Sequence, residues 1–123
     1  MEMRKKKLEV WEKAYSNVHS LAGKYSFSDQ LKIISNLDVM ISMDSANGHL
    51  AANFGVPVIT LWGMTHPFLG FSAFGQNNHL LVDREKFPKV PTSAYGKTVP
   101  KGYRDAMRTI TPEEVIEMVL EKI

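Results

Sequence analysis

Residues 39–49, VMISMDSANGH, carry an apolar run directly into a stretch of small and polar residues. A nearly continuous apolar run is typical of a strand that is covered on both faces, so we predict a strand over 39–43. The residues after it predict a turn into a helix over about 47–54, which Gly55 ends in the usual C-terminal manner. The fold therefore depends on the strand-to-helix junction at residues 44–49.

The rest of the chain repeats this alternation of strands and helices. Further strands are expected at 18–21, 58–62 and 79–82. Further helices are expected over about 4–16, after a cap at Ser26 or Ser28 with Leu31, Ile34 and Leu37 on the apolar face, and after Thr111. Alternation of this kind predicts βαβ units and a parallel sheet. From the residues alone we predict a half-Rossmann α/β domain.

Composition excludes several classes of protein. The 123 residues predict a single domain over 1–123, and 15 basic against 13 acidic side chains leave a net charge of +2, which gives no reason to expect nucleic acid. The absence of cysteine excludes disulfide scaffolds, zinc–thiolate sites and cysteine nucleophiles. No apolar stretch approaches the roughly 20 residues of a membrane span.

Two local features stand outside this alternation. Residues 83–109 contain no periodic pattern and predict a long irregular loop, which usually means a binding surface, a partner contact or mobility. The basic cluster at residues 4–7 is either a solvated helix start or an attraction to anionic lipid, so at most peripheral membrane contact is expected.

The last helix has a complete start signal. Thr111 as N-cap, Pro112 at the first helical position and Glu114 three residues after the cap predict a capping box. Ile110 and Val115 flank it as a hydrophobic staple.

The junction after the strand at 39–43 is the candidate ligand site. Ligands of parallel sheets lie beyond the carboxyl ends of the strands, where the free N–H groups of a helix start favour an anion such as phosphate. The small residues Ser45, Ala46 and Gly48 would let a diphosphate approach the backbone, and Asp44 would face sugar hydroxyls.

Simpler interpretations of the same residues remain open. Asp44 or Ser45 can act as nothing more than the helix cap, and His49 can be a packed or solvated residue. Asp44, His49 and His66 have no diagnostic metal-ligand spacing, so no metal site is expected.

A second turn follows the strand at 58–62. Its polar residues are Thr65 and His66, and the aromatic loop at 68–75 is either a lid over the core or a wall for a ligand.

Three motifs match a known family. Residues 44–52 (DSANGHLAA), 55–58 (GVPV) and 62–67 (WGMTHP) resemble the C-terminal domain of glycosyltransferase family 9, the ADP-heptose:lipopolysaccharide heptosyltransferases. The resemblance extends over about residues 18–82 and 106–122.

This resemblance implies an incomplete C-terminal domain of a GT-B enzyme, with a Rossmann-like three-layer α/β/α arrangement and a mostly parallel sheet. It implies an inverting enzyme that holds a nucleotide sugar, specifically an ADP-sugar, without a metal or other cofactor. The nucleotide-sugar contacts implied are Asp44 with sugar hydroxyls, the backbone of Ser45, Ala46 and Asn47 with the diphosphate, Gly48 and His49 in support of that turn, Tyr25 against the base, and Thr65 and His66 as loop contacts.

The match also has departures and gaps. Ala46 replaces a glycine, Met64 replaces a proline, and His66 stands where the family commonly has an acid. The family's general base lies in an N-terminal acceptor domain, so no catalytic residue is expected in this chain, and alone it is expected to be inactive.

The resemblance carries expectations about partners as well. The full enzyme would use a glycolipid acceptor in the cytoplasm, at the inner face of the cytoplasmic membrane. In the family's strand order, two strands would separate those at 18–21 and 39–43. We expect that gap to close by direct pairing, by rearrangement or by a second copy, and therefore expect a homodimer or swapped assembly.

Three functions thus remain: the donor-binding part of a glycosyltransferase, a binding-only module for ADP or an ADP-sugar, and a structural remnant whose junction is only a helix cap.

Overall fold

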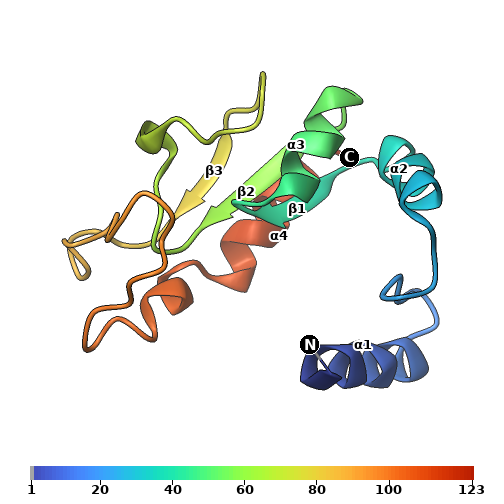
Figure 1. Cartoon of the computed structure of the whole chain (residues 1–123), viewed down its shortest axis with the longest axis horizontal. Coiled ribbons are helices and arrows are strands. Elements are labelled where there is room, and N and C mark those ends of the chain that lie inside the picture. The colour runs from blue at the N-terminus through green and yellow to red at the C-terminus, as the bar shows by residue number, and fades with distance from the viewer. Residues whose placement is uncertain (1) are drawn as a thin grey trace. The chain divides into compact units, whose positions relative to one another are not determined.

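A computed structural model describes residues 2–123 (Figure 1). The chain forms two compact units, the first ending at Lys32 and the second comprising Ile33–Ile123. No helix within residues 2–123 is both long and apolar enough to cross a membrane.

The first unit is built from helices and turns. It contains α1 (Glu2–Ala14) and the start of α2 (Phe27–Ser35). The Ser26 hydroxyl accepts a hydrogen bond from the N–H of Asp29 at 3.1 Å, which confirms Ser26 as the predicted cap of α2.

The predicted strand at 18–21 is wrong, because these residues form no strand. The N–H of Ser20 donates to Glu12 Oε1 at 3.0 Å, and the same carboxylate pairs with Lys24 Nζ at 2.9 Å. The hydrogen bond from Lys24, and then that from Ser20, lower the pKa of Glu12. A polar contact with α1 thus satisfies a backbone group that a sheet would have used.

The second unit contains a parallel sheet of three strands, which confirms the predicted α/β class and Rossmann-like arrangement. The strands β1 (Met40–Met43), β2 (Val58–Trp62) and β3 (Asn78–Leu81) lie in the order β1-β2-β3. In their register Ile59 of β2 lies between Ile41 and Asn78. Val58 and Ile59 of the central strand are 0% exposed, as the apolar run predicted.

Each face of the sheet has its own core. Val58 packs with Ala51 and Ala52 of α3 (Ala46–Asn53), whereas Leu61 packs with the cluster that includes Val115 of α4 (Pro112–Leu120). Because residues 58 and 61 differ by an odd number, they point to opposite faces of β2. Figure 1 shows α3 and α4 on the two sides of the strands, which makes three layers.

The start of α4 is the predicted capping box. Thr111 Oγ1 accepts from the N–H of Glu114 at 3.3 Å, and Glu114 Oε2 accepts from the N–H of Thr111 at 2.8 Å. Ile110 and Val115 both belong to the core on this face, as the staple predicted.

Residues 83–105 contain no helix or strand, and a short 3-10 helix, η2 (Ala106–Thr109), follows them. This irregular segment is nevertheless tied down by polar contacts. The N–H of Asp83 donates to Thr109 Oγ1 at 2.8 Å, and the N–H of Lys89 donates to the Tyr103 hydroxyl at 3.1 Å. A second 3-10 helix, η1 (Pro67–Leu69), lies between β2 and β3.

Candidate functional site

The junction between β1 and α3 is built by close packing. Ser45 has extended backbone angles of φ −149° and ψ 166°, and α3 begins at Ala46, one residue before the predicted start. A Cβ added at Gly48 would lie 3.2 Å from Ser42 Oγ and 3.5 Å from Val58 Cγ1. Gly48 therefore faces the sheet, where the absence of a side chain lets α3 lie close to β1 and β2.

Within residues 2–123, no side chain caps the first turn of α3. The Ser42 hydroxyl donates to the carbonyl of Met43 at 2.7 Å, so in the 3.0 Å contact between Ser42 and Ser45 the Ser45 hydroxyl is the donor. Ser45 occupies the N-cap position of α3, but its side chain makes no cap hydrogen bond. Within residues 2–123 the Asp44 carboxylate accepts no hydrogen bond either. The opening N–H groups of α3, at exposed Ala46 and Asn47, are thus left for solvent or a ligand.

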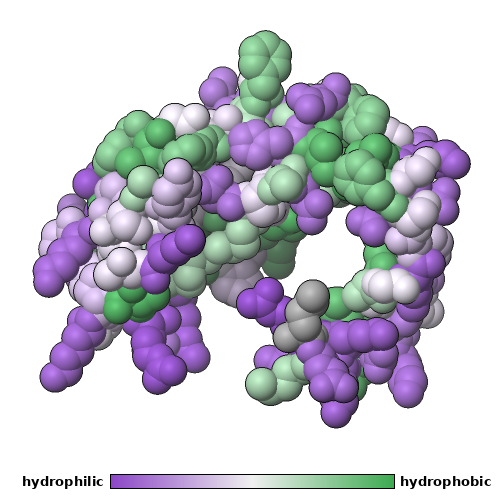
Figure 2. Space-filling model, viewed as in Figure 1, coloured by the Kyte–Doolittle hydropathy of each residue, from purple (hydrophilic) through white to green (hydrophobic). Residues whose placement is uncertain are grey.

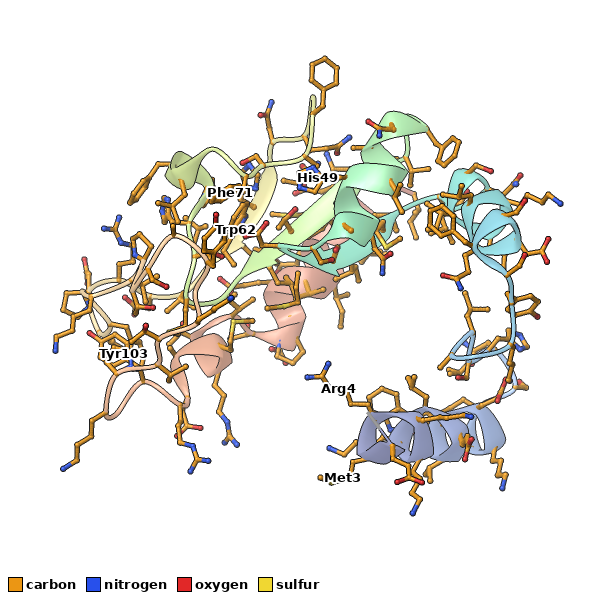
Figure 3. All side chains as sticks on the ribbon, viewed as in Figure 1. Met3, Arg4, His49, Trp62, Phe71 and Tyr103 are labelled. Atoms are coloured by element: carbon orange, nitrogen blue, oxygen red, sulfur yellow. The ribbon has the colours of Figure 1, made fainter. Side chains whose placement is uncertain are left out.

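Two cavities adjoin this turn. The first, of about 290 Å³, is named the helix cavity and is lined by Asp44, Ser45, Ala46 and His49 together with Phe71, Ala94 and Tyr95. Figure 3 labels two of its walls, His49 on α3 and Phe71 in the loop after η1. The second, of about 340 Å³, is named the strand-end cavity and lies where β1 and β2 finish. Its polar lining residues are Asp44, Thr65, Tyr95, Tyr103 and Arg104.

Asp44 and Tyr95 line both cavities, and the segment that carries Tyr95 contacts residues 64 and 65, which follow β2. Gly96 has φ +62°, and a Cβ added to it would lie 2.9 Å from Thr65 Cγ2. The N–H of Thr92 donates to the carbonyl of Met64 at 3.1 Å. The irregular segment is therefore fixed against the residues that follow β2.

Most of the residues predicted for the junction lie around one site. Asp44, Ser45, Ala46 and His49 line the helix cavity, and Asn47 is exposed on the first turn of α3. Gly48 is buried behind this turn.

The remaining predicted residues are Thr65, His66 and Tyr25. Thr65 lines the strand-end cavity and is 8% exposed. His66 instead caps η1, because its Nδ1 accepts from the N–H of Phe68 at 3.2 Å. Burial lowers the pKa of His66, and the neighbouring charge of Arg84 lowers it further, so the ring stays neutral and able to accept. Tyr25 belongs to the first unit, where it is 46% exposed.

Sequence reasoning missed Tyr95, Tyr103 and Arg104. One available signal was charge, because residues 92–104 contain Lys97, Lys101 and Arg104 and no acidic residue. Within residues 2–123, no three His, Asp or Glu side chains gather as metal ligands would.

This geometry can bind an anion next to a group that accepts hydrogen bonds. The N-terminal end of α3 presents N–H groups and a positive partial charge, and the Asp44 carboxylate lies beside it. Asp44 would repel a phosphate placed directly against it but can accept bonds from hydroxyls. A ligand that joins a diphosphate to a polyhydroxylated ring satisfies both requirements.

Comparisons with known proteins identify a family and a curated relative. Residues 2–99 match the family model of glycosyltransferase family 9 (heptosyltransferase). The lipopolysaccharide core heptosyltransferase OpsX of Haemophilus influenzae is 34% identical over 67 residues, which cover 51% of this chain and 19% of that protein. The chain thus matches about a fifth of the length of this curated relative. No solved structure matches. Since the family match covers most of the chain, the chain belongs to glycosyltransferase family 9.

Proposed function

We propose that this chain is the donor-binding part of a glycosyltransferase that moves a sugar from a nucleoside-diphosphate sugar to a glycan acceptor. The donor proposed is ADP-heptose, as the family resemblance implies. The acceptor proposed is a lipopolysaccharide core or similar glycan, and both the heptose and this acceptor agree with the name of the Haemophilus relative, a lipopolysaccharide core heptosyltransferase. The observation that carries the proposal is the uncapped first turn of α3, which opens on the helix cavity beside Asp44.

In this proposal the backbone of α3 holds the diphosphate. The N–H groups of Ala46 and Asn47 would donate to the phosphate oxygens, and the helix dipole would add to their attraction. During transfer the same groups would stabilise the charge that develops on the departing nucleoside diphosphate. The Asp44 carboxylate, which lines both cavities, would accept hydrogen bonds from sugar hydroxyls.

Titration calorimetry of the whole chain with ADP and with ADP-heptose tests this proposal. The sharpest variant is Ala46→Pro, because proline at the first helical position removes one N–H while its fixed φ suits a helix start. The extended conformation of Ser45 is also the one that a residue before proline prefers. Ala46→Ser keeps the N–H and is the matched control.

We expect saturable binding to the unsubstituted chain, weakened about tenfold in Ala46→Pro because one charge-assisted hydrogen bond is lost. Ala46→Ser should bind nearly as tightly as the unsubstituted chain. The absence of heat at millimolar ADP and ADP-heptose would contradict the proposal and favour the structural remnant. Equal binding by Ala46→Pro would show that the first turn of α3 does not hold the diphosphate.

A further inference from the structure

The strand-end cavity has a wall that the family match does not cover. The match ends at residue 99, whereas Tyr103, Arg104 and Met107 also line this cavity. Figure 3 shows Tyr103 at the end of the sheet where the strands finish. This wall is therefore a feature of the present chain that has no role assigned by the comparison.

Among the described residues that line the two cavities, Arg104 is the one that is a lysine or arginine. It is exposed, and within residues 2–123 its guanidinium makes no ion pair or hydrogen bond. Its neighbour Arg108 differs, since its Nε lies 3.2 Å from Asp105 Oδ1. Arg104 and the half-buried Asp44 thus border one cavity without pairing with each other, which leaves the guanidinium available to a ligand.

The surrounding segment strengthens the positive charge. Residues 92–104 carry Lys97, Lys101 and Arg104 without an acidic residue. Figure 2 shows hydrophilic side chains projecting from this end of the second unit, at the lower left. Positive charge therefore comes from two elements, the N-terminal end of α3 and this segment, and the Asp44 carboxylate lines both cavities.

We propose that Arg104 pairs with the phosphate chain of the bound ligand and supplies the cationic charge that offsets Asp44. This inference rests on the proposed function, because it assigns a further binding residue to the same donor site. The planar guanidinium presents paired N–H donors that match two phosphate oxygens, which a lysine ammonium does not reproduce. The α3 amides and Arg104 then hold the anion from different elements, and Tyr95 lies at the border between the two cavities.

Calorimetric titration of the whole chain with inorganic pyrophosphate, with ADP and with ADP-glucose tests this assignment. The variant is Arg104→Gln, with Arg104→Lys as the conservative replacement and Arg108→Gln as the matched control. Because Arg104 is exposed and has no partner in the described chain, thermal unfolding of Arg104→Gln should match that of the unsubstituted chain.

We expect Arg104→Gln to weaken the binding of pyrophosphate and of ADP by about tenfold each, and to make both affinities depend less on salt concentration. Arg104→Lys should recover part of the affinity, and Arg108→Gln should change it less than twofold. Loss of ADP-glucose binding with unchanged pyrophosphate and ADP would overturn the assignment, since the guanidinium would then contact the sugar.

The two proposals fail in different ways. If the unsubstituted chain binds neither these three probes nor ADP-heptose, both the proposed function and the role of Arg104 are wrong. If Ala46→Pro weakens ADP binding and Arg104→Gln does not, the donor site stands and the role of Arg104 alone is wrong.

Discussion

Replacing Gly96 by alanine tests how the irregular segment is held beside the candidate site. Gly96 has φ +62°, and the new methyl would lie 2.9 Å from Thr65 Cγ2 and 3.3 Å from Met64 Cβ. A side chain in the left-handed region costs about 1–2 kcal/mol, and displacing a packed neighbour adds about 1–3 kcal/mol. We therefore expect Gly96→Ala to destabilise the closed segment by about 2–5 kcal/mol.

Two further variants separate the backbone cost from the steric cost. Gly75 has nearly the same backbone angle, φ +68°, but nothing lies within 4 Å of its added Cβ. Gly75→Ala should therefore show only the backbone cost of about 1–2 kcal/mol. Thr65→Ser removes the Cγ2 methyl, so the double variant with Gly96→Ala should recover much of the steric cost.

Urea unfolding followed by circular dichroism gives the global free energy of each variant, and hydrogen exchange of the Thr92 N–H detects opening of the segment alone. ADP binding should weaken in parallel, because Tyr95 would no longer be fixed beside Asp44. The reasoning is refuted if Gly96→Ala costs no more than Gly75→Ala by both measurements, or if Thr65→Ser recovers nothing.

Three other predictions concern the fold. Thr111→Ala should lower the free energy of unfolding by about 1 kcal/mol in a urea titration, because it removes one half of the capping box; a loss below 0.3 kcal/mol, roughly a third of the usual cap, would contradict it. Burial lowers the pKa of His79 below its ordinary 6.5, and its Nδ1 accepts from Trp62 Nε1 at 3.0 Å, so the folded state favours the neutral ring. The stability that the neutral ring contributes is present above pH 6.5 and is lost as the pH falls through the lowered pKa of His79. In His79→Asn the urea midpoint should therefore change less with pH between about pH 7.5 and 5.5. An unchanged slope of midpoint against pH would refute the role of His79. Ile41 on the edge strand β1 is 46% exposed, so the expected dimer should appear at high concentration by size exclusion with light scattering and be lost in Ile41→Lys; a monomer at every concentration would count against it.

Local sequence signals predicted much of the fold. The apolar runs that predicted the strands β1 and β2 and the capping box at Thr111 depend on residues close in the chain, and the structure confirms these elements. The expectation that β1 is covered on both faces is wrong, because β1 is an edge strand in which Ile41 and Met43 are exposed. The prediction of a strand at 18–21 was wrong because an alternating run does not show whether a neighbouring strand is present. Its Ser20 N–H binds Glu12 instead, a contact between residues eight positions apart.

The candidate site likewise has one part that local sequence predicts and one part that depends on distant contacts. The turn at 44–49 was predictable because a strand end and a helix start are adjacent in sequence. Tyr95 and Arg104 were not, since the placement of residues 92–104 depends on Gly96 fitting against Thr65 across the fold. An irregular segment has no periodicity from which such a contact can be inferred.

The hydroxyl chain from Ser45 through Ser42 to the carbonyl of Met43 limits what this turn can offer a ligand. With its proton directed inward, the Ser45 oxygen presents only lone pairs outward and would repel an incoming anion. Recognition of an anion at this turn must then come from the backbone N–H groups. Most side-chain replacements at the exposed positions of residues 45–47 would leave such recognition intact, whereas a change in the path of the main chain would abolish it.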